Sequence, residues 1–469
     1  MDDDNQSGTY DGTARYPYAA IQDAVAAALS GDVVRIAVGS YGPVQTQGKG
    51  LTFLGGYPGA SPAAYAAGTG GDFTQQTLNP ALTVVSGGAQ SAGVTFTRFT
   101  DSPYQGGLDN LTVRQSRKGV VCDTDASWPH PDNLTFSSLV VEDNGGIAGD
   151  ESWGAGMLVC GGNTTIGDSI VRNNRGGWGA GVLRRDGDGT LHMENTRIED
   201  NACLIASCHG AGVSLFSGPN ILVGNLIAGN RIEYDYGWGG GLFITGPGVT
   251  HTSGTIFRDN YAPSYGAAVF VDGSTAVMTN DLVWGNQGGA RGGAGIAADR
   301  EAASLSQVHL DNCTVAGNVS QGLADGGNGL YLDVGSSAVV VDSVFWDNGD
   351  DFFVNVPGGS ALAMTYSLSQ EAWPGTGNLT SDPFFADPGA GDFHLQSVIG
   401  RYQPATGLWV RDARHSPAID AGNPASPFSL EPTPNGSRVN MGAFGDTAQA
   451  SKGRVGFLPG LLLPLFGEP

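Results

Sequence analysis

Lysine is nearly absent from this chain, which has only Lys49, Lys118 and Lys452 among its 469 residues. Lysine and arginine together number 22 against 45 aspartates and glutamates, so the net charge is −23. A nucleic-acid partner needs a basic surface that neutralises phosphates, so we expect none. An anionic membrane surface is disfavoured for the same reason. Neutral glycans, cations and basic surfaces are compatible with this charge.

Long apolar runs are missing as well. No stretch of about 18 apolar residues occurs, so we expect no membrane insertion. The apolar tail Val455–Phe466 is too short to span a bilayer and is interrupted by prolines. Met1 is followed by three aspartates, which a secretory signal peptide would not tolerate, so no export signal is visible.

Glycine, by contrast, is abundant, and the glycines belong to a repeat. Gly accounts for 76 residues without a collagen-like period. An apolar residue, two further residues and an asparagine recur eight times. The eight asparagines lie 26 to 32 residues apart and are Asn144, Asn174, Asn201, Asn230, Asn260, Asn286, Asn318 and Asn348. A variable loop and a strand of small residues, such as Gly179-Ala-Gly-Val, follow each of the first seven.

This period predicts an all-β, single-stranded parallel β-helix (a solenoid) with rungs of about 26–32 residues. Helical and leucine-rich repeats are excluded because no repeat contains an amphipathic helix pattern. We expect the asparagines to form a buried ladder of amides between rungs. A second, mostly small-polar inward column is expected five residues earlier, including Ser169, Thr196 and Asp281. Arg184 falls at an inward position, so we expect its strand to end one residue early.

The two ends of the chain differ from the repeat. Residues 18–29 carry Ile21, Val25 and Leu29 at helical spacing and predict a helix that covers the first rung, followed by a strand over 33–37. We therefore expect an N-terminal cap and first strand over 1–40, a parallel β-helix over 41–375, and a C-terminal capping segment and tail over 376–469.

Several segments resemble known families. Residues 18–41 resemble the N-terminal cap of right-handed parallel β-helix, pectate-lyase-like proteins. The repeats resemble those of polymorphic membrane protein adhesins. Ser381-Asp-Pro-Phe-Phe, Gly391-Asp-Phe-His-Leu, Ser416-Pro-Ala-Ile-Asp-Ala-Gly-Asn-Pro and Asn440-Met-Gly-Ala-Phe-Gly resemble the C-terminal segment of bacterial extracellular β-helix proteins of planctomycete type. The resemblance implies a right-handed β-helix that is secreted or displayed at the cell surface.

The loops between each asparagine and the next glycine-rich strand all leave one edge of the predicted solenoid, which we call the loop edge. Aromatic rings stand where five successive loops rejoin their strands, and we call them the junction rings: Trp153, Trp178, His209, Trp238 and Tyr265. Rungs stack about 4.8 Å apart, so the rings would form a ribbon about 20 Å long that suits a polysaccharide. Their parity with inward Ala155 and Ala180 allows the alternative of an internal aromatic stack.

Candidates for catalysis also lie on the loop edge. A lyase or epimerase needs a base and a charge-neutralising cation, for which Arg175, His209 and Tyr234 are available. An inverting hydrolase needs two separated carboxylates, and Glu233 and Asp235 are candidates. Tyr234 is also a candidate for substrate binding. The acidic turn from Asp347 to Asp351 could bind Ca²⁺, although its spacing is not that of an EF-hand and a polar turn is the alternative.

The five cysteines suggest disulfides. Cys122 and Cys160 align on successive rungs, close enough for a disulfide, and Cys203 and Cys208 bracket one short loop. Cys313 lies in the inward polar column and is expected to be a buried free thiol. Two disulfides fit an oxidising compartment outside the cytoplasm.

These observations predict an extracellular or cell-surface β-helix that engages a polysaccharide along its loop edge. Such a protein could be a polysaccharide lyase or a glycoside hydrolase. The alternative is a non-catalytic adhesin or structural surface protein. No cofactor other than Ca²⁺ is suggested, and the oligomeric state is left open.

Overall fold

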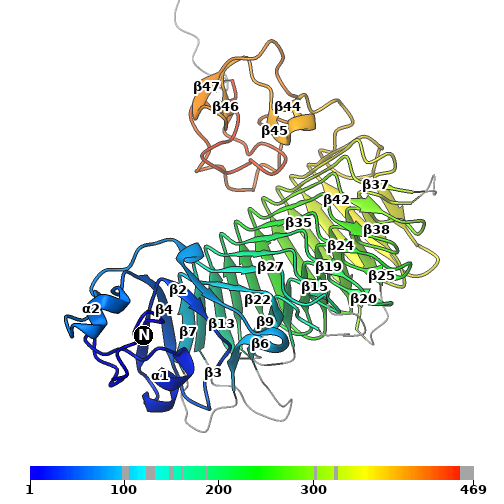
Figure 1. Cartoon of the computed structure of the whole chain (residues 1–469). Coiled ribbons are helices and arrows are strands. Elements are labelled where there is room, and N and C mark those ends of the chain that lie inside the picture. The colour runs from blue at the N-terminus through cyan, green and yellow to red at the C-terminus, as the bar shows by residue number, and fades with distance from the viewer. Residues whose placement is uncertain are drawn as a thin grey trace, which may run out of the picture.

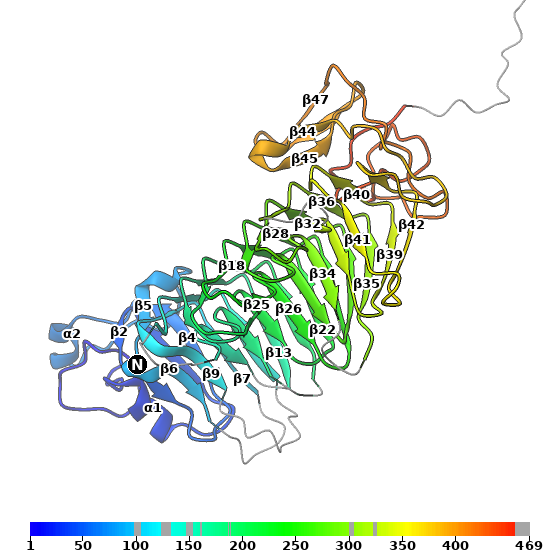
Figure 2. The same cartoon turned by 90° about the vertical axis from the view of Figure 1, so that its right-hand side faces the viewer.

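The computed structural model describes residues 1–97, 105–122, 133–146, 153–159, 162–185, 187, 189–299, 304–321 and 326–454. Its body is a solenoid in which three long parallel sheets run the length of the molecule (Figures 1 and 2). Each sheet takes one strand from each rung, and every strand pairs in parallel with the equivalent strands of the adjacent rungs. This is the β-helix that the repeat predicts.

Within each long sheet, the strands pair in the order in which they follow one another along the chain. The first sheet contains β1 (Val33–Ala37), β4 (Thr52–Tyr57), β7 (Gln105–Asp109), β10 (Asn133–Ser137), β13 (Asn163–Gly167), β17 (Leu191–Glu194), β22 (Asn220–Val223), β27 (Val249–Ser253), β31 (Thr275–Thr279), β35 (Gln307–Asp311), β39 (Ser337–Val341) and β42 (Ala361–Thr365). The second contains β2 (Gly39–Tyr41), β5 (Thr83–Val85), β8 (Thr112–Arg114), β11 (Val140–Glu142), β14 (Ile170–Arg172), β18 (Arg197–Glu199), β23 (Leu226–Ala228), β28 (Ile256–Arg258), β32 (Leu282–Trp284), β36 (Thr314–Ala316), β40 (Val344–Trp346) and β43 (Leu368–Ser369). The third contains β3 (Val44–Gln45), β6 (Gly88–Phe96), β9 (Ser116–Cys122), β12 (Met157–Val159), β16 (Val182–Arg184), β21 (Val213–Leu215), β26 (Leu242–Thr245), β30 (Val269–Asp272), β34 (Ile296–Asp299), β38 (Leu330–Leu332) and β41 (Phe352–Val354).

Two small parallel sheets follow the loop edge. The first has six two-residue strands and begins directly after the repeated asparagines: β15 (Arg175–Gly176), β19 (Ala202–Cys203), β24 (Arg231–Ile232), β29 (Tyr261–Ala262), β33 (Gln287–Gly288) and β37 (Val319–Ser320). The second pairs β20 (Cys208–His209) with β25 (Gly237–Trp238). Because these loop strands are hydrogen-bonded to one another, their side chains repeat at the spacing of the rungs.

The asparagine ladder is confirmed. All eight asparagines are buried. In mid-stack, Asn230 Nδ2 donates to Asn260 Oδ1 at 3.0 Å and to the carbonyl of Ile198 at 2.9 Å. The residue before each asparagine has a left-handed backbone, with φ of 55° at Asp259 and 66° at Gly229. Only Asp, Asn or Gly occupies this position in the eight repeats, because few other residues tolerate that conformation at the bend.

One continuous apolar core fills the solenoid, and it contains the predicted inward residues such as Met157, Val213 and Leu242. The expectation that the strand ends one residue early at Arg184 is wrong. The strand β16 continues through Arg184, whose side chain is fully buried. Its guanidinium donates to the carbonyls of Pro219 and Gly189 and to the side-chain oxygen of Asn220. These oxygens accept from both terminal nitrogens of the guanidinium, while Nε has no partner among the described residues.

The N-terminal end carries short helices: α1 (Ile21–Ala27), α2 (Pro62–Ala66) and the 3-10 turn η1 (Pro80–Leu82). Helix α1 covers the first rung with Ile21 and Val25 buried, as predicted, and β1 occupies the predicted 33–37. Leu29 is 74% exposed, because the helix ends before it.

The C-terminal segment folds back on the outer face of the second sheet near the last rungs (Figures 1 and 2). It contains the antiparallel pairs β44 (Phe385–Asp387) with β45 (Asp392–Leu395) and β46 (Arg401–Gln403) with β47 (Leu408–Val410), and the 3-10 turn η2 (Pro388–Ala390). Phe385, Phe393 and Met441 pack with Leu282 and Val344 of the solenoid. The predicted boundaries at residues 40 and 375 stay predictions, and the predicted tail Val455–Phe466 lies outside the described residues.

Candidate functional site at the loop edge

The junction rings do not lie in the solenoid interior. They pack on the outer face of the third sheet, where Phe243, Phe270 and Tyr331 form a cluster with Trp238 that is separate from the main core. Trp178 contacts Phe216 at a centroid distance of 5.5 Å, and His209 stacks on Phe243 at 4.4 Å. We call the junction rings and these outward rings together the outer aromatic layer.

Glycine makes this layer possible at each rung. The residue after each junction ring is a glycine with a left-handed backbone, for example Gly210 with φ of 63° and Gly239 with φ of 67°. A Cβ at Gly210 would lie only 2.2 Å from the carbonyl oxygen of Val213. The turn therefore requires glycine, and it directs the preceding ring outward while the next residue, such as Ala211, is buried in a small cluster with Cys203 and Ile232.

The rings stack on one another along the solenoid axis. Trp178 is nearly parallel to Trp153 at 4.8 Å and to His209 at 4.5 Å, and these partners belong to the rungs on either side. Both faces of Trp178 are therefore covered, and its indole N–H donates to the carbonyl of Ser207 at 2.8 Å. Trp153 begins the stack and is 37% exposed, whereas Trp238 is only 6% exposed. The row does not offer five free ring faces.

Tyr265 continues the junction column beyond Trp238, to which it is joined by an isolated parallel bridge. It is half-buried and lies 4.9 Å from Tyr331 between ring centroids. Further exposed rings come from the loop that follows β24. Tyr234 is 51% exposed, and Tyr236 lies edge-on to Trp238 at 4.8 Å with the guanidinium of Arg291 over its face. Tyr236 was missed from the sequence, although it shares the loop with Tyr234.

Two arginines on this edge contact other side chains of the edge. Arg175 Nη2 contacts both carboxylate oxygens of Glu233, at 2.9 and 3.1 Å, and so bridges two rungs. Arg231 lies over the ring of Tyr261 at 4.2 Å. Asp235 is exposed. The structure thus brings Arg175 and Glu233 together, but not as an acid and a base around an open reaction centre.

His209 is held as a neutral aromatic ring. It is stacked between Trp178 and Phe243, and its Nδ1 is buried with no hydrogen-bond partner among the described residues. Burial lowers the pKa of His209 to about 4, with Asp272 opposing the shift. The imidazole is therefore uncharged near neutral pH and packs as part of the layer.

The loop between β19 and β20 is closed by a disulfide between Cys203 and Cys208, as predicted. Cys313 is a buried free thiol, also as predicted. Cys122 is disulfide-bonded, and its predicted partner Cys160 lies outside the described residues.

In the acidic turn from Asp347 to Asp351, the carboxylates of Asp350 and Asp351 accept hydrogen bonds from the protein itself, whereas Asp347 is exposed. The buried carboxylate of Asp351 accepts from Asn348 Nδ2 at 2.9 Å and from the backbone N–H groups of Gln370 and Glu371 at 2.9 and 3.2 Å. Asp350 accepts from the N–H of Gly327 at 2.6 Å. Across the described residues, no group of three or more His, Cys, Asp or Glu side chains is placed to hold a metal ion. The turn therefore ends the asparagine ladder and connects it to the segment after β43.

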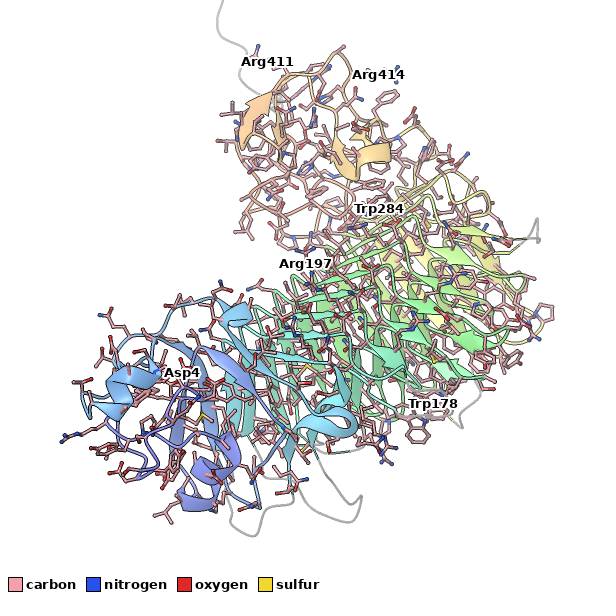
Figure 3. All side chains as sticks on the ribbon, in the orientation of Figure 1. Asp4, Trp178, Arg197, Trp284, Arg411 and Arg414 are labelled. Atoms are coloured by element: carbon pink, nitrogen blue, oxygen red, sulfur yellow. A yellow bond between two sulfur atoms is a disulfide. The ribbon has the colours of Figure 1, made fainter. Side chains whose placement is uncertain are left out.

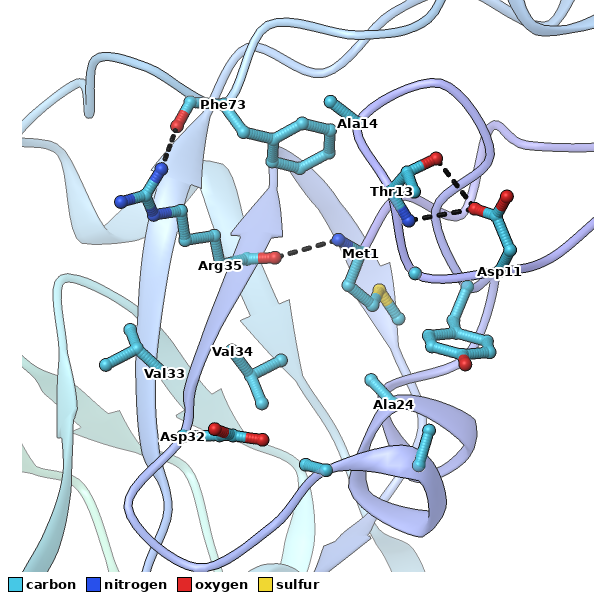
Figure 4. A pocket seen from close by; sticks show the side chains of 14 residues that line it. Met1, Asp11, Thr13, Ala14, Ala24, Asp32, Val33, Val34, Arg35 and Phe73 are labelled. Atoms are coloured by element: carbon cyan, nitrogen blue, oxygen red, sulfur yellow. Dashed lines mark hydrogen bonds between the residues drawn. The ribbon is translucent and has the colours of Figure 1, made fainter.

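A cavity of about 510 Å³ lies at the N-terminal cap between α1 and β1 (Figure 4). Its wall includes Ala24, Val34 and Phe73, and the guanidinium of Arg35 donates to the carbonyl of Phe73 at 2.9 Å. A cleft of about 490 Å³ lies at the other end, between the second sheet and the C-terminal segment. The cavity at the cap is remote in sequence from the loop edge, whereas Gly285 and Gly317 of the cleft shortly precede the edge strands β33 and β37 and lie on the other side of the ladder asparagines.

Comparison with known proteins agrees with this architecture. Residues 186–367 match the family model of the right-handed β-helix region. No curated protein matches the chain. Among the part of the chain that the structure describes, no helix is long and apolar enough to cross a membrane.

Solved structures with a similar chain path include three proteins. Pectate lyase Pel9A has a TM-score of 0.47 and 14% identity over 94% of each chain. XylC in complex with xylose has a TM-score of 0.36 and 9% identity over 82% of this chain and 86% of its own. Tailspike protein 3 of bacteriophage CBA120 has a TM-score of 0.30 and 11% identity over 87% of this chain and 66% of its own. None is similar enough to transfer an activity; the family match over 186–367 and the three parallel sheets agree that this chain adopts a right-handed parallel β-helix fold.

Proposed function

We propose that the protein binds a neutral polysaccharide along the loop edge and does not cleave it there. The observation that carries the proposal is a line of exposed aromatic and hydrogen-bonding side chains held at the spacing of the rungs. Trp153 and Tyr234 are exposed rings, and Arg175, Arg231 and Gln287 are exposed in the six-stranded edge sheet. Five rung steps give this strip a length of about 24 Å, which suits a chain of several sugar units.

The chemistry of these groups favours a sugar polymer. An aromatic face packs against the apolar face of a pyranose, while amides, guanidinium groups and carboxylates exchange hydrogen bonds with its hydroxyls. The net charge of −23 repels strongly acidic polymers, so the proposed ligand is a neutral one. The Cys203–Cys208 disulfide supports a location outside the cytoplasm, where such polymers occur.

The described side chains favour binding over cleavage. A lyase needs a base beside a cation that can neutralise the substrate, but Arg175 is engaged by Glu233, the half-buried His209 is stacked between rings, and the exposed Arg231 lies over the ring of Tyr261. A hydrolase needs one carboxylic acid and one base facing each other across the bond, whereas Glu233 faces an arginine. The rival function is an adhesin whose loop edge contacts a protein surface, and the exposed rings and charges would serve that function too.

A glycan array with the full chain tests the proposal. Combined Trp153→Ala, Tyr234→Ala and Tyr236→Ala should abolish retention of the neutral glycan that the unmodified chain binds, with an unchanged circular dichroism spectrum. The control is Trp409→Ala, because Trp409 is 38% exposed, close to the 37% of Trp153, but lies in the C-terminal segment. Retention by the triple variant would refute the site, and an array without a neutral hit would favour the adhesin.

Cleavage is tested separately on the same glycan. We expect no new reducing ends and no ultraviolet absorbance from unsaturated products after prolonged incubation. Product formation that disappears in Glu233→Gln would overturn the non-catalytic part of the proposal and would make Glu233 a catalytic residue.

A further inference from the structure

A cleft lies between the solenoid and the C-terminal segment, along the outer face of the second sheet. Its floor is the outer surface of β32, β36 and β40, and its far wall is formed by residues 382–396 together with Arg414. Figure 3 shows Trp284 at the border of the solenoid, with the C-terminal segment that carries Arg414 beyond it. The cleft has a volume of about 490 Å³, within the range of sites for small ligands.

Two indoles flank the cleft floor. The register pairs Trp284 with Ala316 and Ala316 with Trp346, so the two tryptophans stand two rungs, or about 9.6 Å, apart with a methyl group between them. Gly317 follows Ala316, and a Cβ placed there would meet nothing within 4 Å. The residues between the two indoles are small: Gly317 has space around it, while Ala316 is buried in the apolar cluster that also contains Phe385 and Phe393.

The opposite wall adds rings and holds the slot open. Phe393 contacts Trp284 at a centroid distance of 5.7 Å, and Phe385 packs edge-on against Phe393 at 5.1 Å. Gln396 holds this wall in place, because its amide donates to the carbonyl of Phe385 at 3.0 Å. Part of the cleft is therefore preformed by packing that does not involve a ligand.

Polar groups line the mouth of the cleft. Arg414 is exposed and lies over the ring of Phe384 at 5.0 Å, and it forms no ion pair with any residue that the structure describes. The exposed carboxylates of Asp347 and Asp382 also line the cleft. One oxygen of Asp382 accepts from the N–H of Phe384 at 2.8 Å. Acceptors and a donor thus surround an aromatic floor.

We propose that this cleft binds one neutral sugar unit or a disaccharide, as a glycan-binding site independent of the loop edge. The apolar face of a pyranose would pack on the indoles, while its hydroxyls donate to Asp347 and Asp382 and accept from Arg414. Two carboxylates against one guanidinium disfavour phosphorylated or uronic ligands. The carboxylates of Asp347 and Asp382 and the guanidinium of Arg414 can together exchange hydrogen bonds with several hydroxyl groups, which favours a polyhydroxylated ligand.

Saturation-transfer difference NMR on the full chain tests this proposal. The probes are glucose, xylose, galactose, mannose and galacturonic acid, each as the monosaccharide and as a disaccharide. We expect transfer to the ring protons of at least one neutral sugar and none to galacturonic acid. Trp346→Ala should abolish the transfer, and Arg414→Gln, at an exposed position that leaves the fold intact, should weaken binding several-fold.

Two variants distinguish sugar binding in the cleft from sugar binding at the loop edge or at an unrelated exposed ring. Trp409→Ala keeps the cleft, and the combined Trp153, Tyr234 and Tyr236 alanine variant alters only the loop edge, so both should retain the signal. No transfer from any neutral sugar, transfer unchanged by both Trp346→Ala and Arg414→Gln, or preference for galacturonic acid would overturn the proposal. A signal lost only in the loop-edge variant would overturn the cleft while supporting the proposed function.

Discussion

Replacing Asn230 by leucine should be strongly destabilising, because this amide joins three consecutive rungs. Its Oδ1 accepts from the backbone N–H of Asn201 at 3.1 Å and from Asn201 Nδ2 at 3.0 Å. Its Nδ2 donates to the carbonyl of Ile198 and to Asn260 Oδ1. All of these groups are buried, so no water replaces the lost partner.

The magnitude follows from the groups that lose their partner. Leucine has a similar volume, so the change opens little space, but the Asn201 N–H and the Ile198 carbonyl become unpaired. Each buried backbone group without a partner costs about 1–3 kcal/mol, and the broken amide contacts to Asn201 and Asn260 add to this. We expect the free energy of unfolding to fall by about 3–5 kcal/mol.

Asn163 provides a matched control. Its Nδ2 donates to Asn133 Oδ1 at 3.1 Å and its Oδ1 accepts from the N–H of Thr190 at 2.9 Å, so it also links rungs, but it is exposed to solvent. Water can replace these contacts, so Asn163→Leu should cost less than about 1 kcal/mol.

Guanidinium unfolding followed by circular dichroism measures both variants, and amide hydrogen exchange over residues 196–236 locates the loss. Exchange should accelerate in these rungs for Asn230→Leu alone. Equal destabilisation by the two variants would refute the reasoning, since it would mean that burial of the ladder does not determine its contribution.

Two further predictions concern buried groups. Burial raises the pKa of Asp281 to about 7, above its unfolded value of about 3.9, so the stability that its protonated form contributes is present below about pH 4 and lost as pH rises through 7. In Asp281→Asn, the denaturant midpoint should fall less between pH 4 and 7 than it does in the unmodified protein. The other groups that titrate in this range are the same in both proteins, so their effects cancel in the comparison. An identical pH profile in the two proteins would contradict the prediction. Thiol titration of the denatured, unreduced chain should find a single free thiol, from Cys313, because Cys203, Cys208 and Cys122 are disulfide-bonded. Three or more free thiols would show that at least one of these disulfides does not form.

Most of the fold could be predicted from the repeat, because equivalent positions of successive repeats stack on adjacent rungs and contact one another. The ladder and the inward columns followed from the spacing of the repeat, and the strand over 33–37 followed from its own sequence after Gly31 and Asp32. The errors at Arg184 and Leu29 have local causes. Oxygens from adjacent turns, which a single repeat does not show, accept hydrogen bonds from the buried arginine, and the helix ends before the leucine.

The candidate site was only partly predictable. The junction rings were found from their spacing, but period-two parity could not decide between an interior and a platform. The structure shows an outer layer in which neighbouring rings stack on the faces of Trp178 and His209. The cleft left a sequence signal that was missed, because Trp284 and Trp346 both occupy the position after the apolar residue of the repeat.

Periodic contacts between adjacent rungs are therefore determined by the sequence itself, since every repeat encodes the same backbone bends, ladders and inward faces. Contacts between non-equivalent segments are not. The pairing of Arg175 with Glu233 depends on loop paths across two rungs, and the cleft depends on how residues 382–414 fold back on Trp284 and Trp346. Only the tertiary structure decides these, because they arise where the repeat is broken and distant parts of the chain compete for the same surface.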